Sequence, residues 1–208
     1  MTTPPVIDLK IILAGRLSSL LRLLLLRGIR FETTPGQSVQ NFLAETLPTD
    51  RNYIENSIQT IFLDGQAIDN PETTLITDPC TIALSVAMPG VFGAAFRKNG
   101  VYSGLRQRYE GNQRKTSVTE PSGNILVTVK CFNRVAEDLG DDLLARGIRL
   151  NIEDFTEFWQ QHKGVLGKGC RQIVVDGRQE TGSRNLMEML RGLTGDLTLA
   201  IETVAEES

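Results

Sequence analysis

One sequence pattern occurs twice in this chain of 208 residues, and the second copy keeps the order of the first. The segment LRGIRF at residues 26–31 returns as ARGIRL at residues 145–150. Three further patterns return at a nearly constant separation. The helical pattern Val39, Phe42 and Leu43 returns as Phe155, Phe158 and Trp159. A strand and turn at 61–66 return at 173–178, and a last strand at 81–84 returns at 198–201. Such a repeat predicts two similar domains in tandem.

The predicted domains cover residues 6–90 and 125–204, and a connector of residues 91–124 joins them. Apolar periodicity and turn signals predict the same order in both domains: strand, strand, helix, strand, strand. The expected elements are strands at 9–14, 29–33, 58–63 and 80–86 with a helix capped by Ser38, then strands at 125–132, 148–152, 172–175 and 197–203 with a helix capped by Asp154. Asp-Gly turns are expected at Asp64 and Asp176.

Two apolar segments add to this pattern. The leucine-rich residues 17–26 predict a short helix or turn. The second copy contains an insertion with the spacing of a short amphipathic helix. Its apolar residues are Leu186, Met189, Leu190 and Leu193.

The order of elements resembles the ubiquitin-like β-grasp fold, and in particular the small sulfur-carrier proteins of molybdopterin and thiamine synthesis. The segments that carry the resemblance are KIILAGRL at 10–17, VQNFL at 39–43, FLDGQ at 62–66 and IALSV at 82–86. The resemblance implies an α+β fold class with two β-grasp domains in tandem, each a mixed sheet packed on one helix.

In the family that the chain resembles, the carrier reaction needs a free C-terminal Gly-Gly, whose carboxylate is adenylated and converted to a thiocarboxylate. The sequence ends in AEES at 205–208, so we expect no carrier chemistry on the intact chain. The first copy ends near Gly90 in the segment MPGVFG at 88–93, but Pro-Gly is also a common turn.

The cysteine content favours a reducing compartment. Cys80, Cys131 and Cys170 are too few and too scattered for a disulfide framework, and they lack the spacing of a metal site. A cytoplasmic location is therefore expected. Arginines interrupt the leucine run at 17–26, which is much shorter than the roughly 20 residues of a membrane span. We expect neither a membrane segment nor a signal peptide.

The sequence predicts no catalytic, cofactor-binding or metal-binding residues, so the protein is expected not to be an enzyme. His162 is the only histidine and is expected near the end of the second helix. The glycine-rich residues 164–169 are interpreted as a plain connection, because a phosphate-binding loop follows a strand and opens a helix. A group of acidic residues is interpreted as a solvated face, because it lacks the spacing of a calcium loop. Its members are Glu137, Asp138, Asp141, Asp142, Glu153, Asp154 and Glu157.

The connector is basic and aromatic, although the whole chain has a net charge of −3. This combination suits a single-stranded nucleic acid or an acidic protein surface. A basic linker can also lie against acidic domains of its own chain. The predicted interaction residues are Phe96, Arg97, Lys98, Tyr102, Arg106, Arg108, Tyr109, Arg114 and Lys115.

The leading hypothesis is a non-enzymatic adaptor or assembly protein that acts through protein–protein contacts of two ubiquitin-like domains. One alternative is a degenerate sulfur-carrier-related protein that docks to a cofactor-synthesis enzyme. Another is single-stranded nucleic-acid binding through the basic connector, although a protein partner is favoured over nucleic acid. One fold hosts many functions, so the sequence leaves open the identity of the partner, the pathway and the formation of a homo-oligomer.

Overall fold

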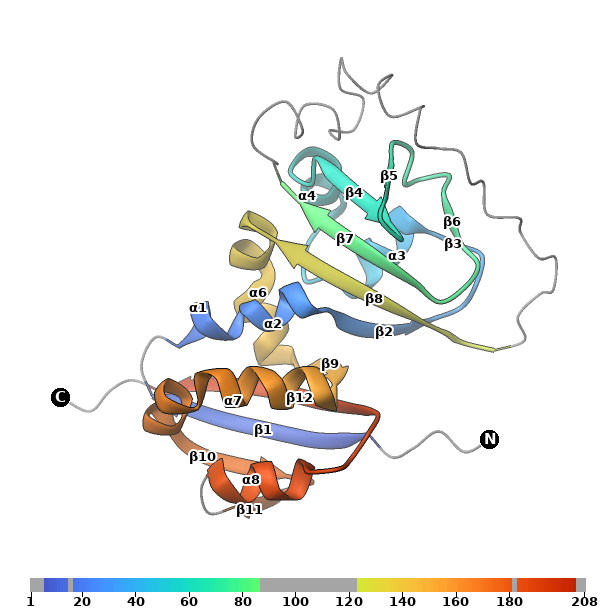
Figure 1. The fold of residues 1–208 in the computed structure, drawn as a ribbon. Helices are drawn as coiled ribbons and strands as arrows, with labels where there is room; N and C mark the ends of the chain where they lie inside the picture. Colours follow the sequence, from blue (N-terminus) through green and yellow to red (C-terminus); the bar gives the residue numbers. More distant parts are fainter. Residues whose placement is uncertain (1–5, 15–16, 87–122, 181–182, 205–208) are drawn as a thin grey trace. The chain divides into compact units, whose positions relative to one another are not determined.

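The computed structural model describes residues 6–14, 17–86, 123–180 and 183–204. Within these residues the chain is α+β, with two five-stranded sheets, a two-stranded sheet and helices that pack on them (Figure 1). The chain divides into two compact units. Unit 1 consists of residues 1–29 and 140–208, and unit 2 consists of residues 30–139. Unit 1 is therefore assembled from two separate stretches of sequence, and unit 2 is formed by the sequence between them.

Unit 2 contains most elements of the first sequence copy and one strand of the second copy. These elements are β2 (Ile29–Thr33), β3 (Gln37–Ser38), α3 (Val39–Thr46), α4 (Arg51–Asn56), β4 (Thr60–Leu63), β5 (Gln66–Ile68), β6 (Leu75–Ile76), β7 (Cys80–Ser85) and β8 (Ile125–Phe132). The five-stranded sheet has the order β2-β8-β7-β4-β5. Strands β7 and β8 run parallel, and β4 is antiparallel to both β7 and β5. Strands β3 and β6 form the two-stranded sheet.

Helix α3 packs on this sheet through the apolar face that its sequence predicts. Ser38 caps the helix, because its Oγ accepts a hydrogen bond from the backbone N–H of Asn41 at 3.3 Å. This bond satisfies one of the free N–H groups at the start of the helix. Phe42 and Leu43 are fully buried, and the Phe42 ring meets the edge of Phe31 in β2 with 6.1 Å between ring centroids. The predicted cap and buried face are confirmed.

Unit 1 combines the first strand of the chain with most elements of the second sequence copy. Its elements are β1 (Ile7–Ala14), α1 (Ser18–Leu21), α2 (Leu23–Arg27), α6 (Arg134–Arg146, from Gly140 onward), β9 (Ile148–Asn151), α7 (Ile152–Gly169), β10 (Cys170–Val175), β11 (Arg178–Glu180), α8 (Ser183–Leu190) and β12 (Asp196–Val204). The sheet has the order β11-β10-β1-β12-β9. Helix α7 lies across one face of this sheet (Figure 1).

Strand β1 lies in the centre of this sheet and pairs on both sides. It runs parallel to β12 along its whole length and antiparallel to β10. Its side chains Leu9, Ile11 and Leu13 are fully buried. The strand therefore supplies unit 1 with backbone hydrogen bonds and with part of its core.

The two Asp-Gly turns have the same geometry in the two units. Asp64 and Gly65 join β4 to β5 with φ angles of 47° and 81°, and Asp176 and Gly177 join β10 to β11 with φ angles of 48° and 76°. Positive φ at both positions is characteristic of the type I′ hairpin turn, for which Asp-Gly is a favoured pair. Both predicted turns are confirmed.

Each turn aspartate also forms hydrogen bonds with the backbone of a neighbouring strand. These bonds show which strand lies next to the turn in each sheet. The Asp64 N–H donates to the Thr81 carbonyl at 2.8 Å, and the Asp64 Oδ1 accepts from the Thr81 N–H at 2.8 Å. The Asp176 N–H donates to the Asp8 carbonyl at 2.8 Å, and the Asp176 Oδ1 accepts from the Asp8 N–H at 2.9 Å. Thr81 belongs to β7 and Asp8 to β1. Strand β1 therefore has the position in unit 1 that β7 has in unit 2.

The compact units differ from the contiguous domains predicted at 6–90 and 125–204, because β1 pairs in unit 1 and β8 pairs in unit 2. The structural counterpart of residues 81–84 is residues 8–11, and the predicted counterpart 198–201 lies in the neighbouring strand β12. The physical reason is that β1, β7, β8 and β12 share one alternation of buried aliphatic side chains. This pattern predicts a half-buried strand but does not select its sheet.

Helix α7 is longer than predicted at both ends. The Asn151 Oδ1 accepts hydrogen bonds from the backbone N–H groups of Glu153 and Asp154 at 2.7 and 3.4 Å. Asn151 is therefore the cap, one turn before the predicted cap Asp154. The helix continues through residues 164–169, so the predicted connection is helical. The fully buried Leu166 packs this last part of the helix into the core, which offsets the low helix propensity of its glycines.

The predicted apolar segment after β1 forms the two short helices α1 and α2, which contact α6. The Arg22 Nε and Nη2 donate to the Asp141 Oδ1 and Oδ2 at 3.0 and 2.5 Å. These two residues lie 119 positions apart, as do the repeated segments 26–31 and 145–150. A Cβ added at Gly140 would lie 2.7 Å from the Arg22 Cγ. Glycine at this position therefore permits the close approach of the two helical segments.

A fragment of residues 29–139 is expected to fold alone, because it contains every strand of the sheet in unit 2. A fragment of residues 6–90 is expected to remain unfolded, because it lacks β8 and the buried side chains Val127 and Val129. Amide dispersion in ¹H–¹⁵N spectra and cooperative urea unfolding measure both outcomes. If the 6–90 fragment folds and the 29–139 fragment does not, the assignment of β8 to unit 2 is wrong.

The replacement Gly140→Ala is expected to lower the free energy of unfolding by about 1–3 kcal/mol, because the added methyl group overpacks the contact with Arg22. Gly164→Ala in α7 is the matched control, since nothing lies within 4 Å of its added Cβ. This control is expected to raise the free energy of unfolding by about 0.5–1 kcal/mol through helix propensity. Urea unfolding measures both variants, and equal stabilisation by both would show that Gly140 makes no close contact.

Candidate functional site

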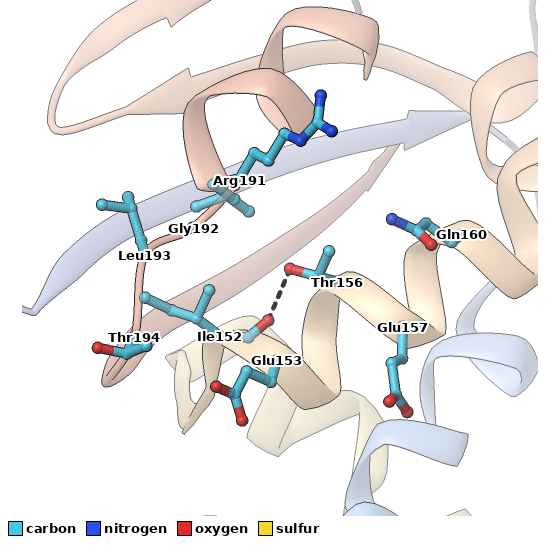
Figure 2. A pocket seen from close by; sticks show the side chains of 10 residues that line it. Ile152, Glu153, Thr156, Glu157, Gln160, Arg191, Gly192, Leu193 and Thr194 are labelled. Carbon is cyan, nitrogen blue, oxygen red and sulfur yellow. Dashed lines mark hydrogen bonds between the residues drawn. The ribbon is translucent and has the colours of Figure 1, made fainter.

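A groove of about 350 Å³ lies in unit 1 between α7 and the loop that follows α8 (Figure 2). Its lining residues are Ile152, Glu153, Thr156, Glu157 and Gln160 from α7, and Leu190, Arg191, Gly192, Leu193 and Thr194 from the end of α8 and the loop. We call it the α7–α8 groove. It combines apolar lining residues with charged side chains, so it is the candidate functional site.

Backbone hydrogen bonds position the two walls of the α7–α8 groove. The Ile152 N–H donates to the Gly195 carbonyl at 3.0 Å, which links the first turn of α7 to the end of the loop. The Leu193 N–H donates to the Leu190 carbonyl at 3.2 Å. This turn passes through Gly192 with a φ of 80°, a conformation that favours glycine. The shape of the groove is therefore set by the backbone.

The insertion in the second copy forms the predicted amphipathic helix and exposes two of its apolar side chains. Leu186 and Leu190 are 0% and 2% exposed, whereas Met189 and Leu193 are 42% and 44% exposed. Leu190 and Leu193 line the groove together with the buried Ile152. Exposed apolar side chains beside a groove are typical of an interaction surface.

Charged side chains line both walls of the α7–α8 groove. The Arg27 Nη1 donates to the Glu157 Oε2 at 3.1 Å, and the Arg27 Nη2 donates to the Gln161 Oε1 at 2.9 Å. Glu157 is therefore neutralised by α2. Neither the Glu153 carboxylate nor the Arg191 guanidinium has an ion-pair partner among the described residues. In Figure 2 Arg191 extends from the wall opposite α7.

A second groove, of about 460 Å³, lies in unit 2 and has polar walls. Its lining residues are Glu32, Thr33, Thr34, Pro35, Gln37, Glu45 and Asn124. The Thr33 Oγ1 donates to the Gln37 Oε1 at 2.8 Å, and the Gln37 Nε2 donates to the Glu45 Oε2 at 2.5 Å. These side chains bond to one another, so the groove offers less apolar area and fewer free polar groups than the α7–α8 groove.

His162 lies inside α7 rather than at its end, because the helix extends to Gly169. Its ring packs against the ring of Phe158 with 4.7 Å between centroids. Its position therefore corrects the prediction, and the ring contact gives it a packing role.

The three cysteines differ in their burial. Cys80 and Cys131 are buried, and Cys170 is half-buried at the start of β10. Burial raises the pKa of Cys131 to about 12, so its thiol stays protonated and unreactive near neutral pH. Burial also raises the pKa of Cys170, and a hydrogen bond with the backbone of Gln172 opposes this rise. The Cys170 thiol donates a separate hydrogen bond to the Gln172 carbonyl at 3.8 Å.

The acidic residues that the sequence assigns to a solvated face make surface contacts. Asp141 and Glu157 pair with arginines. Asp138 accepts a hydrogen bond from the Tyr53 hydroxyl at 2.8 Å and lies 3.5 Å from the Arg134 Nε. Burial of Tyr53, followed by this contact with Asp138, raises the Tyr53 pKa above its usual value. Among the described residues no group of three or more His, Cys, Asp and Glu side chains could hold a metal ion.

The predicted interaction residues of the connector lie outside the described residues, as does Gly90. These interaction residues are Phe96, Arg97, Lys98, Tyr102, Arg106, Arg108, Tyr109, Arg114 and Lys115. Sequence reasoning did not identify the α7–α8 groove as a site. The signal that could have found it was the number of apolar residues in the insertion, which exceeds what one buried face of a short helix needs: Leu186 and Leu190 are buried, whereas Met189 and Leu193 remain exposed.

Comparisons with known proteins give no relative for this chain. No family model, no curated protein and no solved structure matches it. None of the helices in the described residues is long and apolar enough to cross a membrane.

Proposed function

We propose that both units are β-grasp domains and that the protein is a non-enzymatic adaptor, which binds a protein partner through the α7–α8 groove. The observation that carries this proposal is the 44% exposure of Leu193 in a groove that Ile152 and Leu190 also line. Clustered exposed apolar side chains mark protein–protein contact sites more often than isolated exposed apolar side chains do.

The match between the two sheets supports the β-grasp proposal. Strands β2, β8, β7, β4 and β5 of unit 2 correspond in order to β9, β12, β1, β10 and β11 of unit 1. Each sheet contains one parallel pair in its interior, β7 with β8 and β1 with β12. Helix α3 or α7 follows the edge strand β2 or β9 in the sequence. A mixed sheet packed on one helix is what the β-grasp resemblance implies.

The adaptor proposal is also supported by backbone hydrogen bonds of the groove residues. The hydrogen bonds of Ile152 and Leu193 fix both walls before any partner binds. A preformed surface loses little conformational entropy on association, which favours its use as a binding site.

The replacement Leu193→Asp is expected to reduce recovery of a specific partner by about tenfold or more, because it places a charge on the exposed apolar side chain that lines the groove. Tagged full-length protein is purified from its native cells, and co-purifying proteins are quantified by mass spectrometry. Val165→Asp is the matched control, since Val165 is 52% exposed on α7 and does not line the groove. ¹H–¹⁵N spectra verify that both variants are folded.

The proposal predicts a protein that is recovered with the wild-type chain and the Val165→Asp variant but lost with Leu193→Asp. Equal recovery of all co-purifying proteins by the two variants would contradict the use of this groove.

A further inference from the structure

From the chemistry of its two walls, we infer that the α7–α8 groove binds a protein segment that carries a large apolar side chain between a basic residue and an acidic residue. This inference rests on the proposed function and specifies the chemistry of the partner. The apolar side chain lies against Ile152, Leu190 and Leu193. The basic residue lies beside Glu153 on α7, and the acidic residue lies beside Arg191 on the loop.

The apolar contact follows from the burial of the groove residues. Ile152 and Leu190 are 3% and 2% exposed, so they belong to the core and present a fixed base. Leu193 is 44% exposed and stands at the side of the groove. A large side chain that enters here removes the exposed part of Leu193 from water, which is favourable in proportion to the apolar area covered.

The charge pattern follows from which groove residues are already paired. The Arg27 guanidinium on α2 already forms an ion pair with the Glu157 carboxylate. Glu153 and Arg191 have no ion-pair partner among the described residues, and both line the groove. A partner with a Lys or Arg at one end and an Asp or Glu at the other end meets both charges at once. Opposite charges across an interface select the partner and its orientation.

The size of the groove determines what can occupy it. About 350 Å³ is enough for one or two large side chains but not for a folded domain. A short segment of a partner, presented as a helix with apolar residues on one face, therefore fits better than a flat protein surface.

Two synthetic peptides of about 15 residues on an alanine-rich helical host test this chemistry. Both carry the same leucine stripe. The mixed peptide has lysines on one flank of the stripe and glutamates on the other, and the acidic peptide has glutamates on both flanks. Each is titrated into ¹⁵N-labelled full-length protein. The mixed peptide is expected to shift the amide signals of Thr156, Gln160 and Leu193, and to bind at least about two- to fivefold more tightly than the acidic peptide.

Charge reversal at Glu153 tests the contact with the basic residue. Glu153→Lys is expected to weaken binding of the mixed peptide and to strengthen binding of the acidic peptide. Glu137→Lys is the matched control, because it changes the net charge equally on the exposed surface of α6, outside the groove. It is expected to leave the preference between the two peptides unchanged.

The inference is overturned if the two peptides bind equally or if neither peptide shifts any amide signal. It is also overturned if Glu153→Lys and Glu137→Lys change the preference between the peptides to the same extent. The co-purification experiment with Leu193→Asp distinguishes a wrong partner chemistry from a wrong proposed function. If Leu193→Asp releases a partner whose contact segment has no basic residue, the adaptor function stands and the inferred partner chemistry is wrong. If Leu193→Asp releases no partner and neither peptide binds, both fail.

Discussion

Strand β1 holds the sheet of unit 1 together, because β10 and β12 each pair with β1 and, within the described residues, not with each other. Without β1 the sheet would separate into two two-stranded ribbons, β11 with β10 and β12 with β9. Two-stranded ribbons are marginally stable in water. The core would also lose the fully buried Leu9, Ile11 and Leu13. Folding of residues 140–208 therefore depends on a strand that lies more than a hundred residues earlier in the sequence.

The candidate site depends on the same strand. The loop that forms one wall of the α7–α8 groove leads directly into β12, which is held in place along its length by β1. The other wall is the first half of α7, and the hydrogen bond from Ile152 to Gly195 joins the two walls. The exposed Leu193 is thus presented by a rigid scaffold. Under the proposed function, the fold sets the binding surface and the charges of Glu153 and Arg191 select the partner.

The sequence predicted the main strands and the helices α3, α7 and α8, but it missed the helices α4 and α6 and predicted the pairing of the strands poorly. Local signals sufficed for the Ser38 cap, the Asp64 and Asp176 turns and the amphipathic helix of the insertion, because each depends on neighbouring residues. The place of β1 depends on long-range pairing, and its aliphatic alternation matches that of β7, β8 and β12. The length of α7 was missed because burial of Leu166 outweighs the helix-breaking tendency of its glycines. The α7–α8 groove was missed because its walls come from segments about thirty residues apart that only the fold brings together.

Interstrand nuclear Overhauser effects in the full-length protein test whether β1 completes the sheet of unit 1. Backbone contacts are expected between β1 and β12 in the parallel register that places Lys10 beside Ala200, together with contacts between Lys10 and Val174 of β10. Contacts between β1 and β7 in place of these, with β8 absent from the side of β7, would show instead that each sequence copy forms its own sheet.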